Sequence, residues 1–231
     1  MAESNEATRI QAGVDELGTA GFSVCSGMLP LALVASLVAE QRRREDGGEM
    51  VVAGVGRGAT PGVLAHDLPR AQTLEAQTLR ASARQAQSSW FNDQSAAERH
   101  FLAFAERVRL VINRRLMLGL FEFEAQFLHY PPGGYYRRHI DALHGERNRV
   151  VSLVAYLNED WTSEDGGALA VWAAGGEGEP VAEVVPLAGT VVLMLSEEIP
   201  HEARVARRER RAIAGWFRVN GSGGDRIDLA R

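Results

Sequence analysis

The spacing of apolar residues changes near the middle of this chain, and that change limits the fold more than any other feature. From Phe121 to Phe127 apolar and polar side chains alternate, which is typical of a strand with one buried face. Further β-like runs follow, separated by glycine-rich breaks, at Val150 to Leu157, Ala168 to Trp172, Val181 to Val185, Thr190 to Leu195 and Ala212 to Val219. Several short strands after a helical front half predict a β-sandwich or jelly roll braced by helices.

The front half carries helical spacing in three places. Ile10, Val14 and Leu17 mark a first helix, residues 31–38 after Pro30 a second, and a stripe from Phe101 to Ile112, preceded by a capping sequence at Ser95, a third. Short strands are expected at 22–28 and 50–55, and a turn at 54–58. Residues 59–94 are the least regular, and we expect a mobile loop there, up to Trp90.

Composition sets the class of protein. A length of 231 residues with 45% hydrophobic content is enough for one sizeable core. Cys25 stands alone, and the acidic N-terminus lacks a secretion signal, so we expect a cytoplasmic monomer without membrane contact. The net charge of −5 argues against nucleic-acid binding, and the arginine run at 207–211 is interrupted by a glutamate. Lysine is absent, so every cationic role falls to arginine.

His139, Asp141 and His201 form a candidate metal site. Positions i and i+2 of a strand point to the same face, so His139 and Asp141 could reach one ion, with His201 coming from another strand. Two imidazoles and a carboxylate cover one side of an octahedral ion and leave the other side open. This arrangement suits Fe(II) that binds a cosubstrate and dioxygen together. The alternative is that the three residues are unrelated polar groups in the core or on the surface.

Arg210 is the candidate anchor for a dicarboxylate cosubstrate. It shares one strand face with Ala212, Ala214 and Trp216, and the small alanines leave room for a ligand. A buried arginine needs a carboxylate partner, which either the cosubstrate or an acidic residue of the chain could supply. Arg211, on the opposite face, is the competing candidate. On the strand at 150–157, the side chain of Tyr156 would look into the same space as the metal.

Several motifs occur in a fixed order between about Phe121 and Val219. They are Tyr130-Pro-Pro-Gly-Gly-Tyr-Tyr136, His139-Ile-Asp141, Tyr156-Leu-Asn-Glu-Asp-Trp161, Asp165-Gly-Gly-Ala-Leu169, Pro200-His201-Glu202 and Arg210-Arg-Ala-Ile-Ala-Gly-Trp216. Together they resemble the Fe(II)- and 2-oxoglutarate-dependent prolyl 4-hydroxylases, in the branch that contains the hypoxia-inducible-factor prolyl hydroxylases and their bacterial relatives.

The resemblance implies a mainly β, α+β fold, a double-stranded β-helix (jelly roll) braced by N-terminal helices. One oxygenase domain would span residues 1–220, with a helical and β part at 1–118, a barrel core at 119–219 and a flexible tail at 220–231. It further implies a set of site residues. His139, Asp141 and His201 would bind Fe(II), Arg210 and Tyr156 the 5-carboxylate of 2-oxoglutarate, and Tyr130, Leu169 and Trp216 would line the pocket.

The activity that the resemblance implies is hydroxylation of a prolyl residue in a protein, with dioxygen as oxidant and ascorbate as a candidate reductant. Elongation factor Tu is one substrate of bacterial relatives. Three alternatives stay open. The same chemistry could act on a small molecule or a non-prolyl residue, the chain could be a non-catalytic metal-binding jelly roll, or it could be a nucleic-acid-directed oxygenase, which would need a basic groove.

One stretch departs from the family pattern. Where relatives carry an Arg-Gly-Asp turn followed by an aromatic residue, this chain has Arg84-Gln85-Ala86 ahead of Trp90. Because Ala86 replaces the aspartate, the ion pair expected with Arg149 is predicted to be absent. Arg84, Trp90 and Arg149 are the candidate substrate-loop residues, and the change bears on substrate binding and loop closure rather than on the metal chemistry.

Overall fold

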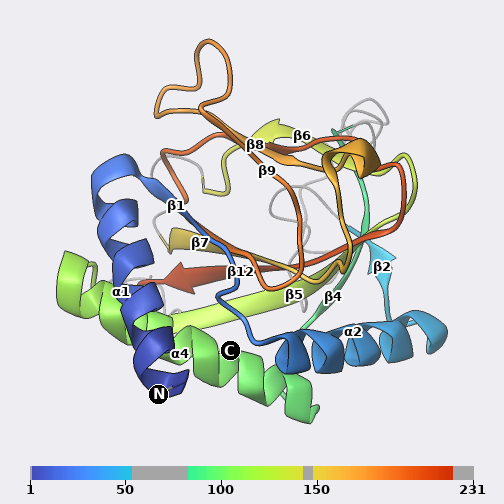
Figure 1. Ribbon diagram of the computed structural model, residues 1–231, viewed down its shortest axis with the longest axis horizontal. Coiled ribbons are helices and arrows are strands. Elements are labelled where there is room, and N and C mark those ends of the chain that lie inside the picture. Colours follow the sequence, from blue (N-terminus) through green and yellow to red (C-terminus); the bar gives the residue numbers. More distant parts are fainter. Residues whose placement is uncertain (1, 54–82, 143–147, 221–231) are drawn as a thin grey trace, which may run out of the picture.

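The computed structural model describes residues 2–53, 83–142 and 148–220. Two sheets face each other, and the helices pack on the outer face of the larger sheet (Figure 1). The helices of the described part are α1 (Ala2–Ala20), α2 (Leu31–Asp46) and α4 (Ala96–Leu116), with a short 3-10 turn η3 (Ser163–Asp165). None of them is both long enough and apolar enough to cross a membrane.

The chain crosses repeatedly between the two sheets. In chain order the strands are β1 (Phe22–Cys25), β2 (Val51–Val52), β3 (Arg84–Gln85), β4 (Gln87–Trp90), β5 (Glu122–Tyr130), β6 (Tyr135–His139), β7 (Arg149–Tyr156), β8 (Leu169–Val171), β9 (Ala182–Val184), β10 (Val191–Leu195), β11 (His201–Ala203) and β12 (Arg210–Arg218). The larger sheet has the order β1-β10-β7-β12-β5-β4-β2 and the smaller one β3-β6-β11-β8-β9, with antiparallel pairing throughout. The predicted jelly roll is confirmed.

The alternating sequence pattern divides the larger sheet into two buried faces. On β12, Ile213 and Phe217 point outward and join the core under the helices, while Ala212, Ala214 and Trp216 point into the space between the sheets. Gly215 belongs to the outward set, but a Cβ there would lie 2.2 Å from the ring of Phe123. The aromatic ring therefore occupies the place that a side chain at 215 would need.

Arg44 joins the helical layer to the larger sheet. Its side chain is 2% exposed and donates to Glu98 Oε1 at 2.5 Å, to Trp90 O at 2.6 Å and to Asn92 Oδ1 at 3.1 Å. Ser95 caps α4 as predicted, since its side chain accepts from the Glu98 amide. The Glu98 carboxylate, which a capping box would use locally, binds Arg44 instead. This buried ion pair connects α2, α4 and the end of β4.

The structure corrects the sequence prediction for the segment that leads to Trp90. We predicted irregular chain up to Trp90, but β3 and β4 are strands, because they pair with β6 and β5 respectively. Residues 59–82 of that expected loop, the expected turn at 54–58 and residues 221–231 of the expected tail lie outside the described residues. The extent of the single domain stays a prediction.

Candidate active site

His139, Asp141 and His201 come together between the sheets. One ligand atom from each lies within 4.8 Å of the others. His139 ends β6 and is the register partner of His201, which begins β11, so strand pairing alone brings the two imidazoles together. Asp141 Oδ1 lies 3.5 Å from His139 Nε2, and its Oδ2 lies 3.7 Å from His201 Nε2. The donor set suits a divalent iron with open coordination positions.

Asp141 is positioned by contacts that the sequence did not predict. We expected it within a strand beside His139, but β6 ends at His139 and Asp141 lies in a bend. The amides of Asp141 and Ala142 both donate to Ser196 O at 3.1 Å. Ser152 Oγ donates to Asp141 Oδ2 at 2.6 Å and lies 2.8 Å from Ser196 Oγ. Ser152, within β7, therefore holds the carboxylate, and Ser196, just after the neighbouring β10, holds the Asp141 backbone.

Backbone carbonyls orient both imidazoles. Nδ1 of His139 lies 2.8 Å from Arg137 O, and Nδ1 of His201 lies 3.1 Å from Ile199 O. A carbonyl oxygen only accepts, so each Nδ1 carries the hydrogen and each Nε2 keeps its lone pair. The lone pairs are thus left on the side of Asp141, as metal ligation requires.

The electrostatics of Asp141 and His201 favour the protonation states that metal binding needs. Burial works to raise the pKa of Asp141, but the His201 and His139 imidazoles and the Ser152 hydroxyl outweigh it, so the pKa lies well below its usual range. Burial lowers the pKa of His201 to about 4, and the neighbouring His139 adds to this shift. A carboxylate beside neutral imidazoles is the state in which such residues bind a metal.

Arg210 is buried beside this site without an acidic partner in the described part of the chain. The residue is 2% exposed, and its guanidinium lies 4.8 Å from the ring centroid of Tyr130 and 5.2 Å from that of Tyr156. Its Nε donates to Gly167 O at 2.8 Å. The buried Tyr156 hydroxyl also has no hydrogen-bond partner among the described residues. A buried cation beside an unused hydroxyl calls for an anion that the described residues do not supply.

Gly167 makes the contact with Arg210 possible. Its φ is +66°, and a Cβ there would lie 3.0 Å from Arg210 Cδ and 3.2 Å from the Trp161 ring. The Trp161 indole donates to Gly166 O at 2.9 Å and so holds the same turn. The competing Arg211 points the other way, where it pairs with the carboxylates of Glu45 on α2 and of Glu209 just before β12.

The cavity at the metal site is lined by most of the residues that the sequence singled out for the cosubstrate, but not by Tyr156, which lies behind Arg210 with its ring centroid 5.2 Å from the guanidinium. The lining includes Tyr130, Leu169, Arg210 and Trp216 together with the three metal-site residues. The cavity is narrow, about 50 Å³, and a larger hollow of about 570 Å³ lies elsewhere on the molecule. We assign the chemistry to the smaller one, because it alone holds the clustered ligands among the described residues.

The predicted substrate-loop residues lie around the same cavity. Arg84 lines it and stacks on Tyr136 at 4.7 Å, and Trp90 packs on Trp216 at 6.0 Å. Arg149 has a partner that the sequence did not predict. Its Nε donates to Glu124 Oε1 at 2.8 Å. Arg149 also lies 3.9 Å from the Trp216 ring centroid. The alternating pattern of β5 was the available signal, because it puts Glu124 on the face toward the cavity.

Comparison with known proteins agrees with this geometry. Residues 125–218 match the family model described as the 2OG-Fe(II) oxygenase superfamily. A prolyl 4-hydroxylase from Pseudomonas putida is 39% identical over 92% of this chain and 100% of that chain, with a TM-score of 0.75. The chain belongs to the 2-oxoglutarate- and Fe(II)-dependent oxygenase superfamily. Within it, the protein is a prolyl 4-hydroxylase-like enzyme, and the cofactors that its family and its His-Asp-His triad imply are Fe(II) and 2-oxoglutarate.

More distant structures share the fold. A Trichoplax adhaerens prolyl hydroxylase, solved with a peptide fragment of hypoxia-inducible factor, is 21% identical over 94% of this chain and 92% of that chain, with a TM-score of 0.74. The α-ketoglutarate-dependent epimerase SnoN of nogalamycin biosynthesis is 15% identical over 96% of this chain and 92% of that chain, with a TM-score of 0.64. A search of curated proteins finds no match. The fold alone therefore does not fix the substrate.

Replacing Ser152 with alanine should weaken binding of Fe(II) by about 10-fold to 100-fold, because the hydroxyl that orients Asp141 is lost. Calorimetric titration with Mn(II), a redox-stable substitute, would measure the change. Ser23→Ala is the matched control, since Ser23 is equally buried but lies on β1, outside the cavity. Equal metal affinity in the two variants would show that Ser152 does not position the ligand.

Proposed function

We propose that the protein is an Fe(II)- and 2-oxoglutarate-dependent dioxygenase that hydroxylates a prolyl residue of a protein substrate. The observation that carries the proposal is the buried Arg210, which faces the metal-site cavity without a carboxylate partner among the described residues. The identity of 39% with a prolyl 4-hydroxylase supports the prolyl substrate. The peptide bound by the Trichoplax relative supports a polypeptide substrate, through a shared fold only.

Each residue of the site has a defined part in this proposal. His139, Asp141 and His201 hold the iron, whose chemistry with dioxygen and 2-oxoglutarate supplies the oxidising power, and ascorbate is a candidate reductant. Arg210 neutralises the far carboxylate of 2-oxoglutarate. Burial raises the pKa of Tyr156 to about 12, so its hydroxyl keeps its proton at neutral pH and can donate to the same carboxylate.

The walls of the site keep water away from the reacting groups. Tyr130 lies opposite Arg210 in the register of β5 and β12, and its ring covers one side of the guanidinium. Leu169 and Trp216 close the cavity with apolar surface. With few waters to compete, the ion pair between Arg210 and a bound carboxylate is stronger than it would be in solvent.

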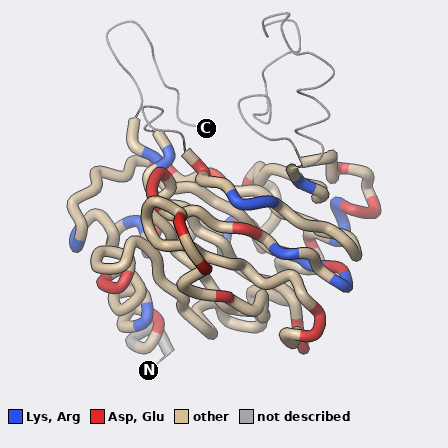
Figure 2. Tube along the Cα trace, turned by 90° about the horizontal axis from the view of Figure 1, so that it is seen from above, with Lys and Arg blue, Asp and Glu red and all other residues tan. Residues whose placement is uncertain are grey.

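A protein partner fits the surface charge better than nucleic acid does. Figure 2 shows acidic and basic residues interspersed over the described chain, without a continuous basic track. We propose that Arg84, Trp90 and Arg149 contact the substrate at the edge of the cavity. Elongation factor Tu stays a candidate on the initial resemblance alone. A cytoplasmic, monomeric enzyme is likewise our proposal, which the lone cysteine supports.

Consumption of 2-oxoglutarate tests the proposal directly. The iron-loaded enzyme should convert 2-oxoglutarate to succinate slowly alone and faster with the substrate protein, and mass spectrometry should then find one added oxygen atom on a proline. Oxygen on another residue or on a small molecule would replace the prolyl assignment. Metal binding without any 2-oxoglutarate consumption would leave only the non-catalytic jelly roll.

Replacing Arg210 with alanine should weaken 2-oxoglutarate binding by roughly 30-fold to several thousand-fold, since losing one partner of a buried charge pair costs about 2–5 kcal/mol. Metal affinity should change little, because the Arg210 side chain donates to Gly167 O and not to a metal-site residue. Anaerobic calorimetry can measure both affinities. Arg211→Ala, one residue away on the other face, should leave 2-oxoglutarate binding unchanged. Equal losses of metal and 2-oxoglutarate would contradict the assignment.

A further inference from the structure

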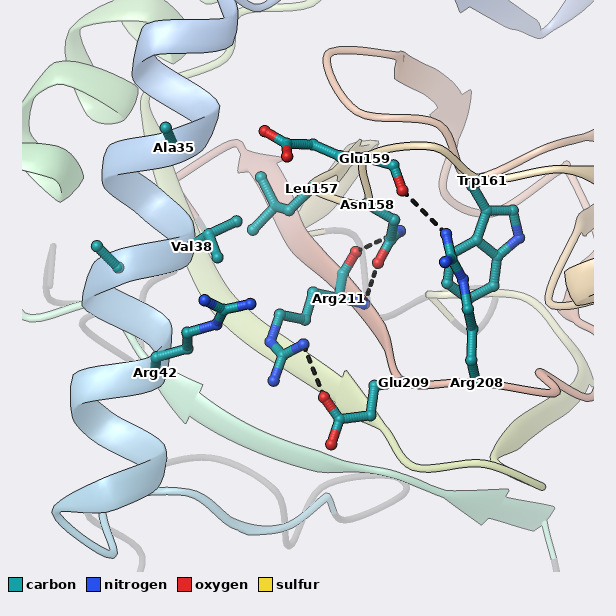
Figure 3. Close-up of a pocket in the computed structure, with 11 residues that line it drawn as sticks. Ala35, Val38, Arg42, Leu157, Asn158, Glu159, Trp161, Arg208, Glu209 and Arg211 are labelled. Carbon is teal, nitrogen blue, oxygen red and sulfur yellow. Dashed lines mark hydrogen bonds and ion pairs between the residues drawn. The ribbon is translucent and has the colours of Figure 1, made fainter.

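A second hollow of about 570 Å³ lies on the outer side of the larger sheet, between α2 and the chain segments next to the ends of β7 and β12 (Figure 3). We call it the outer cleft. Its walls include Val38 and Arg42 of α2, Leu157 and Trp161 after β7, and Arg208 and Arg211 near the start of β12. The outer cleft is separate from the metal site, because Arg210 points between the sheets and Arg211 points outward.

Among the described residues, Arg42 is the one arginine of the outer cleft without an acidic partner, since Arg208 pairs with Asp165 at 3.4 Å and Arg211 pairs with Glu45 and Glu209. Three arginines and two glutamates line the outer cleft, whereas the whole chain has a net charge of −5. Arg42 is exposed on α2 and makes no hydrogen bond or ion pair with the described residues. In Figure 3 its guanidinium reaches from the helix across the cleft toward the side chain of Arg211. An anion placed between them would be attracted by both.

Arg211 can accept such an anion by exchanging one partner. It pairs with Glu45 at 2.8 Å and with Glu209 at 3.0 Å. The Glu45 side chain, on the last turn of α2, is 18% exposed, but the Glu209 side chain is 55% exposed. A surface ion pair of this kind is worth little, about 0–1 kcal/mol. An incoming oxyanion can therefore replace Glu209 on Arg211, while Glu45 keeps the guanidinium in place.

The rest of the outer cleft offers apolar and aromatic surface. Val38 and Leu157 lie on one side, beside the two arginines (Figure 3). On the other side Arg208 stacks on Trp161 at 4.5 Å, and its NH2 donates to the carbonyls of Glu159 and Asp160 at 2.9 and 3.0 Å. A concave site of this volume, apolar with a few fixed charged groups, is typical of small-molecule sites.

We propose that the outer cleft binds a small organic anion. Its carboxylate or phosphate group bonds to Arg42 and Arg211, and its apolar part lies against Val38 and Leu157. Arginine suits either oxyanion, because the guanidinium fork matches both geometries. This site goes beyond the oxygenase reaction, and it does not depend on which substrate the iron oxidises.

Calorimetric titration with benzoate, phenyl phosphate and inorganic phosphate tests the proposal. The enzyme should be loaded anaerobically with Mn(II) and saturated with 2-oxoglutarate, so that Arg210 is not available to the probes. We expect saturable binding of benzoate or phenyl phosphate, tighter than that of inorganic phosphate. The tighter of the two organic probes identifies the ligand as a carboxylate or a phosphate. Absence of saturable binding at millimolar concentrations, or equal affinity for inorganic phosphate, would overturn the proposal.

Three variants locate the site. Arg42→Gln should weaken binding of the organic probe by about 10-fold, since a charge-assisted bond is lost. Glu209→Gln should strengthen binding, because the competing carboxylate is removed. Arg43→Gln is the matched control: Arg43 is adjacent on α2 but pairs with Glu40 and Glu49 outside the cleft, so affinity should not change. Binding that Arg42→Gln and Arg43→Gln alter equally would place the anion elsewhere and refute the assignment.

Discussion

Replacing Asp141 with alanine should abolish 2-oxoglutarate turnover and reduce metal affinity by more than about 100-fold, beyond the range that is usual for residues behind the ligands. The carboxylate is the only anionic group of the described ligand cluster, so two neutral imidazoles would be left to hold a dication. Titration of the purified variant with Mn(II) measures the affinity, and succinate formation with Fe(II) measures the turnover.

The same variant should still fold. Ser152 and Ser196 lie 2.8 Å apart and can bond to each other after the carboxylate is gone. The thermal midpoint without metal should therefore stay near that of the wild type, while the rise in the midpoint on adding metal disappears. Glu202→Ala, next to His201 on β11 but outside the cavity, is the control for loss of one carboxylate. If metal still raises the thermal midpoint of Asp141→Ala, the proposed ligand set is wrong.

Replacing Arg44 with methionine should cost about 3–5 kcal/mol of folding free energy, the largest stability loss we expect from one side chain of the described chain. The change leaves the carboxylate of Glu98, whose side chain is 0% exposed, without its cation. Burial already raises the pKa of Glu98, and the charge of Arg44 is the main opposing influence. Urea unfolding measures the loss.

Two further variants separate the ion pair from helix propensity. Arg43→Met removes the neighbouring, half-exposed arginine and should cost less than about 1 kcal/mol, as surface pairs do. The double variant Arg44→Met with Glu98→Gln should recover part of the loss, because no buried charge is then left unpaired. If Arg44→Met and Arg43→Met unfold at the same urea concentration, the buried pair does not hold α2 to α4.

The alternating pattern of the sequence placed part of the site, the family resemblance supplied Tyr130, Leu169 and Trp216, and the rest depended on contacts between distant segments. The alternation of side chains along a strand predicted that Arg210 and Arg211 face opposite sides of the sheet. In the structure Arg210 lines the metal-site cavity, and Arg211 pairs with Glu45 on the outer side. The same rule failed for Asp141. Its position depends on the carbonyl of Ser196, which lies beyond the end of β10, and no local pattern encodes that contact.

The strands β3 and β4 show a second limit of local patterns. Their residues include Arg84, Gln85 and Gln87, which have weak strand propensity, so the sequence predicted a loop. Pairing with β6 and β5 overrides that propensity. The pairing of Glu124 with Arg149 has a related cause: the family pattern places the acid at residue 86, whereas in this chain the acid comes from β5.

The central place of β12 in the larger sheet has a consequence for folding during synthesis. This strand comes last among the described strands, yet it lies in the middle of the sheet, bonded to β5 on one side and β7 on the other. While the chain is being made, β5 and β7 each present an open edge that only this late strand can close. The same strand delivers Arg210. With Arg210 as the proposed cosubstrate anchor, a growing chain therefore completes its cosubstrate site in the same step that joins the two halves of its sheet.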